Sequence, residues 1–165
     1  MYAFSPEHWS DFFVAEIGAT AALAGLLTVA ISINLKAIVE GRLLSGRAAE
    51  TILMLGGVLV LSTLALVPGQ TVVALGYEEL GLGVIIGCFQ TVILLRARRF
   101  YHEQERRWMR VAFGVSFIFP LLLSGLSLAT AGFVPGGLYW LVPSVVIGVV
   151  GGLINSWVLL VEILR

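Results

Sequence analysis

Residues 111–161 read VAFGVSFIFPLLLSGLSLATAGFVPGGLYWLVPSVVIGVVGGLINSWVLLV, a run without a single Asp, Glu, Lys or Arg. The hydrocarbon core of a bilayer is about 30 Å thick and takes roughly 20 residues of helix to cross. The run is too long for one span and predicts two, with a turn at the Val-Pro-Gly-Gly sequence 134–137, because proline and glycine readily end helices. This stretch therefore predicts a multi-pass helical membrane protein.

The composition of the whole chain agrees with this fold class. Of its 165 residues, 59% are hydrophobic and 12% are charged, and the mean hydropathy is +1.01. Soluble domains are about 25% charged, so the chain carries too little charge to cover a water-facing surface. A soluble globule and a disordered chain are both excluded.

Three further apolar runs lie between charged residues, at positions 17–35, 51–77 and 80–95. With the long run they predict an all-α protein of five transmembrane helices in a single domain, 1–165, with spans at about residues 12–35, 50–68, 78–96, 110–133 and 138–162.

Prolines locate the start of the first span and the end of the second span more precisely. The first helix is expected to begin at Ser5-Pro6-Glu7, with serine as the cap and proline at the first helical position. Pro68-Gly69 is expected to bend or end the second span. Residues 71–76 then form either a short extension of that span, which we favour, or a re-entrant turn.

The distribution of positive charge predicts the orientation. All ten Lys and Arg fall at residues 36–47, residues 96–110 and position 165. Cytoplasmic segments of membrane proteins carry the excess of Lys and Arg, so the N-terminus is expected outside and the C-terminus in the cytoplasm. Residues 1–20 hold no Lys or Arg, whereas a secretory signal peptide opens with positive charge, so the first span is expected to be retained.

Small residues recur at helical spacing in three of the predicted spans. In lipid such residues let helix backbones approach closely. They are Gly18, Ala22 and Gly25 in the first span, Gly83 and Gly87 in the third, and Ser144, Gly148, Gly152 and Ser156 in the fifth. We interpret them as packing faces, either within one chain or between copies, and a homo-oligomer is expected.

Polar residues inside the spans are candidate pathway-lining residues, because polar groups in a membrane are costly and often functional. Glu16, Thr20 and Asn34 share one face of the first span, and Gln90 and Asn155 lie near mid-depth in the third and fifth. The alternative is structural: Glu16 and Asn34 reach the interfaces, and Gln90 and Asn155 form hydrogen bonds between helices.

Two prolines fall inside predicted spans. Pro120 is expected to bend the fourth span near its centre and to free the carbonyl of Ser116. The Ser116 hydroxyl or a neighbouring helix can then satisfy the exposed backbone. Pro143 is expected to do the same near the outer end of the fifth span, and in both places we favour a static bend over a hinge.

Acidic residues and a histidine gather on the expected outer side, namely Glu7, His8, Asp11, Glu78 and Glu79. Carboxylate and imidazole groups could bind a divalent ion. An acidic helix start and ordinary outer-loop residues are the simpler explanation, so no metal site is predicted.

The segment RARRFYHEQERRWMR, residues 96–110, is strongly basic. Its arginines are expected to contact anionic lipid headgroups at the cytoplasmic face, each contributing about 1 kcal/mol; they are Arg96, Arg98, Arg99, Arg106, Arg107 and Arg110. A cytosolic protein partner is the alternative. The formal net charge of the chain is zero, so binding to nucleic acid is not expected.

The inventory of reactive residues does not favour an enzyme. His8 and His102 are expected on opposite sides of the membrane, and Asp11 is the only aspartate, so neither a paired-histidine metal site nor an aspartyl dyad forms within one chain. No phosphate loop or zinc-protease motif is present. No catalysis and no cofactor are predicted.

The N-terminal third resembles a group of small, largely uncharacterised bacterial integral membrane proteins that are common in actinobacteria. The resemblance covers roughly residues 9–70 and rests on Trp9, Phe12-Phe13, Gly18, the stretch AALAGL at 21–26, and LVPGQ at 66–70. It implies a multi-pass protein of the bacterial cytoplasmic (inner) membrane and implies no activity.

Two functions follow from these patterns. The leading hypothesis is a non-catalytic structural or accessory membrane component that acts through helix packing and its basic cytoplasmic loops. The alternative is a small oligomeric channel or transport protein for ions or protons, with the polar residues of the spans lining the path.

Overall fold

The structure is a computed structural model that describes residues 2–41, 44–97 and 104–163, with the side chains of 97, 104–110, 159–160 and 162–163 left out. Five long helices make up most of it: α1 (Ser10–Ile33), α3 (Leu44–Ala65), α4 (Val72–Ala97), α5 (Gln104–Ala129) and α6 (Leu141–Ile163). The short helix α2 (Leu35–Glu40) and three 3-10 turns, η1 (Tyr2–Phe4), η2 (Pro6–Trp9) and η3 (Gly137–Trp140), complete the described elements.

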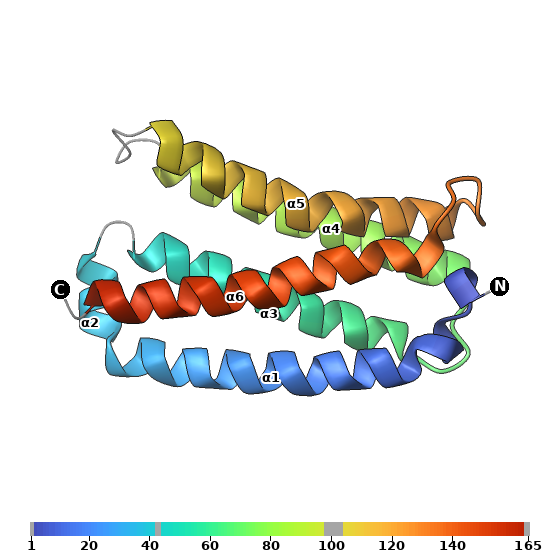
Figure 1. Ribbon diagram of the computed structural model, residues 1–165, viewed down its shortest axis with the longest axis horizontal. Helices are drawn as coiled ribbons and strands as arrows, with labels where there is room; N and C mark the ends of the chain where they lie inside the picture. Colours follow the sequence, from blue (N-terminus) through green and yellow to red (C-terminus); the bar gives the residue numbers. More distant parts are fainter. Residues whose placement is uncertain (1, 42–43, 98–103, 164–165) are drawn as a thin grey trace.

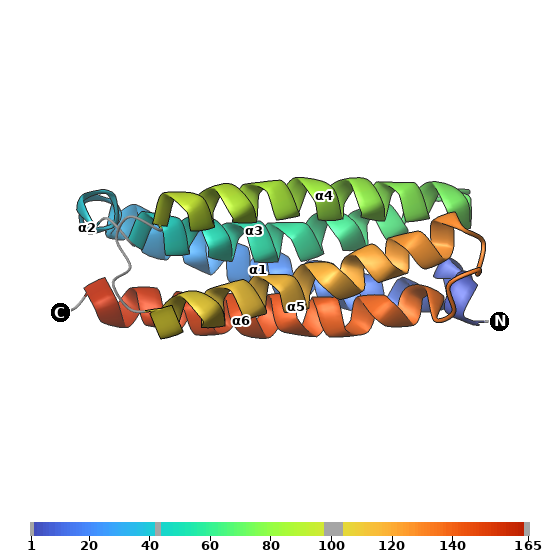
Figure 2. The ribbon, with the colours of Figure 1, turned by 90° about the horizontal axis from the view of Figure 1, so that it is seen from above.

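The five long helices, the first taken together with η2, form candidate spans of 19 to 28 residues that are long and apolar enough to cross a membrane. The predicted fold class, an all-helical protein with five spans, is thereby confirmed. The helices lie lengthwise in one bundle (Figures 1 and 2), with the described chain starting at one end and α6 finishing at the other. We call these the N-terminal and C-terminal ends of the bundle.

The connection between the second and third spans differs from the prediction. Helix α3 ends at Ala65 and α4 already begins at Val72, so residues 72–76 open the third span and do not extend the second. Pro68 has no amide hydrogen to continue a helix, Gly69 turns the chain with a φ of +72°, and the Thr71 hydroxyl accepts a hydrogen bond from the amide of Ala74 (3.2 Å). Helix α4 therefore begins at Val72, before the position near residue 78 that Glu78 and Glu79 suggest for the third span.

The first helix starts where the sequence predicts. Ser5 occupies the N-cap position and Pro6 the first turn, but this turn is a 3-10 helix, and the α-helix proper begins at Ser10. The Trp9 indole nitrogen donates a hydrogen bond to the carbonyl of Tyr2 (2.9 Å), which folds the first residues back over the end of the bundle.

The helices form two groups. Helices α4 and α5 pack together most extensively, and Figure 1 shows this pair diverging from the others toward the C-terminal end. Helix α3 contacts α1 on one side and α6 on the other, whereas α1 has few contacts beyond α3. Most of the α1 surface therefore faces outward.

Glycines allow close approach at three helix contacts. A Cβ at Gly125 on α5 would lie 2.9 Å from the carbonyl oxygen of Gly76 and 2.9 Å from the amide of Leu80, both on α4. On α6, a Cβ at Gly148 would lie 2.7 Å from Phe117 of α5, and one at Gly152 would lie 2.7 Å from Leu55 of α3. The first contact involves backbone atoms and requires glycine, whereas side chains would have to shift to admit a Cβ at the other two.

Neither proline inside the predicted spans ends its helix. Pro120 is buried inside α5, which runs as one α-helix from end to end of its range. The backbone is supported from a neighbouring helix, since the Ser144 hydroxyl on α6 donates a 2.7 Å hydrogen bond to the carbonyl of Phe117. Pro143 is the third residue of α6, where a helix does not use the amide hydrogen, so it breaks nothing.

Candidate functional site

A glutamate is buried inside the bundle. Glu79 lies seven residues after the start of α4, about 10 Å along the helix, and is 0% exposed. Within the described part of the chain, neither of its carboxylate oxygens has a hydrogen-bond partner. A buried carboxyl group without partners is costly, and such a residue in a membrane helix is a functional candidate.

The nearest polar neighbour of Glu79 comes from α5. The Ser124 hydroxyl is close enough to interact with the carboxyl group, although the two do not meet the geometry of a hydrogen bond. The glycine contact between the helices explains this proximity, because Ser124 precedes Gly125 and Glu79 precedes Leu80, which touch. Close backbone packing thus brings the serine against the acid.

A second serine lies at the same level on α3. The Ser62 side chain is 0% exposed, and its hydroxyl, like that of Ser124, has no hydrogen-bond partner among the described residues. Ser62 lies between Gly57, where a Cβ would lie 2.7 Å from Ile86 of α4, and Ala65, which shares a cavity lining with Leu75 of α4. Glu79 lies between Leu75 and Ile86, so α3, α4 and α5 each place a polar residue at this depth.

An apolar layer closes the bundle on the C-terminal side of this level. Its side chains come from three helices and are 0 to 3% exposed; they are Val58, Ile86, Phe117 and Leu121. They belong to one buried cluster. An aqueous path past Glu79 is therefore closed in this conformation.

Beyond the apolar layer lies a cavity of about 220 Å³, which we call the C-end cavity. Two predicted pathway residues meet here: Gln90 of α4, which is 5% exposed, and Asn155 of α6. The lining also contains Glu50, Met54, Phe113, Gly151 and Ile154. Glycine makes room for the amide, because a Cβ at Gly114 of α5 would lie 2.9 Å from the Gln90 side-chain nitrogen.

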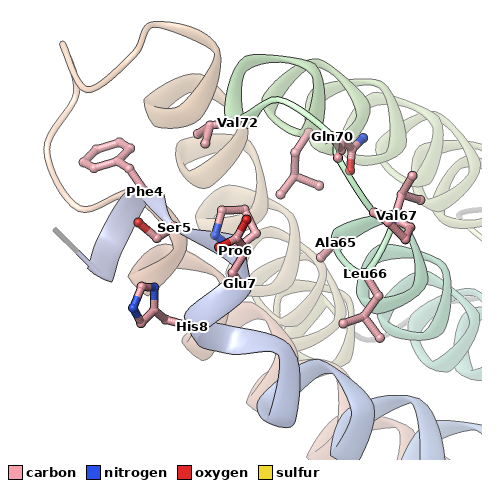
Figure 3. A pocket seen from close by; sticks show the side chains of 13 residues that line it. Phe4, Ser5, Pro6, Glu7, His8, Ala65, Leu66, Val67, Gln70 and Val72 are labelled. Carbon is pink, nitrogen blue, oxygen red and sulfur yellow. The ribbon is translucent and has the colours of Figure 1, made fainter.

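A larger cavity of about 540 Å³, the N-end cavity, opens at the other end. Figure 3 shows the first residues of the chain on one side of it and the α3–α4 connection on the other. Leu75 belongs to its lining and lies one helical turn before Glu79. The two cavities therefore lie on opposite sides of the buried glutamate.

The three predicted pathway residues of α1 do not join this arrangement. The Thr20 hydroxyl donates to the carbonyl of Glu16 in its own helix, and the Asn34 side-chain amide donates to the carbonyl of Ala30 (2.9 Å). Glu16, Thr20 and Asn34 line neither cavity. The side chains of Thr20 and Asn34 thus bond to backbone carbonyls of their own helix.

The predicted packing residues divide between contact and open surface. Besides Gly148 and Gly152, Gly83 lies in a helix contact, where a Cβ would meet Leu122 at 2.7 Å, and Gly87 approaches Ile118 more loosely. Ser144 bonds across to α5, whereas the Ser156 hydroxyl donates to its own helix at Gly152 (2.7 Å). In α1, by contrast, Gly18, Ala22 and Gly25 are exposed, and a Cβ at either glycine would meet nothing within 4 Å.

The sequence prediction missed Glu79, Ser62, Ser124 and Glu50. The charge pattern places both Glu50 and Glu79 at the ends of spans, yet both lie within helices and are buried. One pattern could have identified Glu79. It shares a helix face with Gly83, Ile86 and Gln90 at spacings of four, three and four residues, so the face runs from an acid to an amide through apolar positions.

The basic residues that the structure describes lie at the C-terminal end of the bundle. Arg96 is exposed in the last turn of α4. Arg98 and Arg99 lie outside the described residues, as do the side chains of Arg106, Arg107 and Arg110. Within the described ranges, no group of three or more His, Cys, Asp or Glu residues is placed to hold a metal ion.

In comparisons with known proteins, no family model, no curated protein and no solved structure matches this chain. The chain is a multi-pass membrane protein whose candidate site is the buried glutamate between the N-end cavity and the C-end cavity.

Proposed function

We propose that this protein moves protons or small monovalent cations across the membrane through its helix bundle, with Glu79 as the central site. One observation carries the proposal: Glu79 is fully buried, and neither carboxylate oxygen has a hydrogen-bond partner in the described part of the chain. A purely structural glutamate at this depth is expected to be paired. A group that must bind and release a cation needs free acceptor atoms.

The arrangement around Glu79 supports transport through one chain. The N-end cavity reaches Leu75, one turn from the glutamate, and the C-end cavity with Gln90 and Asn155 lies beyond the apolar layer. A closed layer between two cavities suits a gated path better than an open pore. Separation of the α4–α5 pair from α3 and α6 would open it, since Phe117 and Ile86 belong to that pair.

The surroundings of the protein are part of the same proposal. The resemblance over residues 9–70 supports the bacterial cytoplasmic membrane, and the positive charge at one end supports an external N-terminus. We further propose that the chain is not an enzyme and that the arginines of residues 96–110 contact anionic lipid headgroups.

The test uses purified protein in liposomes. Proton entry is followed by quenching of a pH-sensitive dye under a potassium diffusion potential, and sodium and potassium entry by tracer uptake. Wild type is expected to exceed empty liposomes, and Glu79→Gln to lower the flux at least tenfold. Glu40→Gln is the matched control, because Glu40 is exposed at the end of α2. Equal flux in wild type and Glu79→Gln would overturn the proposal.

The exposed face of α1 favours a second candidate, the accessory component that acts through helix contacts. Gly18, Ala22 and Gly25 lie open along a helix that packs mainly on α3. A face of small residues can receive another helix in lipid, from a second copy or from a partner protein. Copurification of a partner that is lost on Gly18→Leu, together with an absence of flux, would favour this function over transport.

A further inference from the structure

We infer that the N-end cavity is a binding site for small cations and the port through which they reach Glu79; this inference rests on the proposed transport function. The cavity has a volume of about 540 Å³, and liquid water occupies about 30 Å³ per molecule. It therefore has room for a cation together with much of its hydration shell.

Three segments build the cavity. The first side chains of the chain, Phe4 to His8, form one wall, and the α3–α4 connection from Ala65 to Gln70 forms another, as Figure 3 shows. Val72 and Leu75 of α4 complete the lining. The site thus lies where η2, the end of α3 and the start of α4 meet.

The polar atoms of the lining favour a positive ligand. Glu7 contributes a carboxylate, and the side-chain oxygen of Gln70 is buried without a hydrogen-bond partner in the described structure. The Gln70 amide is oriented by Glu78, whose carboxylate accepts a hydrogen bond from the Gln70 nitrogen. The opposite amide orientation would place the Gln70 oxygen against a carboxylate oxygen of Glu78. The amide nitrogen of Gln70 therefore bonds to Glu78, and its amide oxygen remains as an acceptor.

The charges at the N-terminal end of the bundle also favour a positive ligand. The ten Lys and Arg of the sequence fall at residues 36–47, 96–110 and 165, and the described ones among them belong to the C-terminal end. Glu7, Asp11 and Glu78 are exposed at the N-terminal end. Like charges around a cavity raise the local concentration of the opposite ion, so cations are enriched there.

Leu75 separates the cavity from the buried glutamate. It lines the cavity, is 1% exposed, and lies four residues before Glu79 on α4, about 6 Å along the helix. A cation in the cavity is thus one side chain away from the central site. A small movement of Leu75 is sufficient to connect them.

The inference is tested by charge-selective labelling in detergent at low ionic strength. Val72→Cys and Val67→Cys place a thiol in the lining, in a Cys88→Ala background because Cys88 is exposed. Rates are measured with a cationic trimethylammonium-ethyl and an anionic sulfonatoethyl methanethiosulfonate. Phe133→Cys is the reference for intrinsic reactivity, since Phe133 is 89% exposed at the same end and outside the cavity.

The ratio of cationic to anionic labelling rates at each cavity position is divided by the same ratio at Phe133→Cys. This normalised ratio is expected to exceed five at both cavity positions. Glu7→Gln and 0.5 M salt are expected to reduce it at least twofold, because exposed charges are screened, while Glu40→Gln leaves it unchanged. A normalised ratio near one overturns this inference alone when flux still depends on Glu79. A clear preference without any flux retains the cation site and overturns the transport function.

Discussion

The Ser144 hydroxyl on α6 donates a 2.7 Å hydrogen bond to the backbone carbonyl of Phe117 on α5. Phe117 lies three residues before Pro120, where a helix loses one of its amide donors. The sequence predicted that the free carbonyl would be that of Ser116, satisfied locally or by a neighbouring helix. The donor from the neighbouring helix reaches the carbonyl of Phe117, one residue further along, and not that of Ser116.

This bond predicts a difference between two serines of α6. Ser144→Ala is expected to lower the free energy of unfolding by about 0.6–1.7 kcal/mol, the range of interhelical hydrogen bonds in membranes. Ser156→Ala is expected to change it less, because the Ser156 hydroxyl bonds only within α6 among the described contacts. Reversible unfolding in mixed micelles measures both. A larger loss at Ser156 would contradict the interhelical role.

Glycine substitutions should rank by what surrounds them. Of three such variants, Gly125→Ala is expected to be the most destabilising, because its Cβ would meet the backbone of α4, which cannot rotate away. Gly148→Ala is expected to cost about 1–3 kcal/mol, since the Phe117 and Val58 side chains can shift. Gly18→Ala has open space and should be neutral or stabilising. Thermal loss of the monodisperse peak in detergent gives the order, and destabilisation by Gly18→Ala would contradict it.

Replacing Glu79 with an apolar residue should separate stability from function. A buried polar group without a partner costs about 1–3 kcal/mol, so Glu79→Leu is expected to raise the unfolding free energy while abolishing cation flux. Leu75→Ile is the control on the same helix and should leave stability within about 1.5 kcal/mol. Unfolding and flux are measured on one preparation. Destabilisation by Glu79→Leu would assign the glutamate a structural role.

The outward face of α1 predicts where copies of the chain meet, if they associate. Native mass spectrometry from mild detergent is expected to show an oligomer for wild type and smaller species for Gly18→Leu and Gly25→Leu. Gly56→Leu is the control, because a Cβ there also meets nothing within 4 Å but on α3. A single-chain mass for wild type would remove the homo-oligomer.

The orientation predicts the labelling of two exposed positions at opposite ends. In a Cys88→Ala background, an impermeant maleimide added to intact bacterial cells is expected to modify Phe133→Cys and to spare Ser45→Cys. Ser45 lies in the first turn of α3, at the C-terminal end, and is exposed. The reverse pattern would invert the topology and leave the five spans intact.

The number of spans could be predicted because it depends on charge spacing and on a fixed bilayer thickness. The site could not, since the same rule that located the spans treated Glu50 and Glu79 as their ends. The small-residue stripes of α1 and α6 show a second limit. Their spacing is alike, yet α6 packs inside and α1 lies open, because lipid and helix surfaces are equally apolar. The contact between Gly76 and Gly125 uses one glycine from α4 and one from α5. A search for small residues at regular spacing within one helix therefore does not find it.

The contact of Gly76 with Gly125 also bears on how the protein enters its membrane. Helix α4 leaves the ribosome before α5 exists, and the Glu79 carboxyl group is costly to place in lipid on a lone span. Joined at the two glycines, α4 and α5 pack closely and set Ser124 beside Glu79. We therefore expect the pair to partition into lipid as a helical hairpin, with the glutamate already shielded by α5.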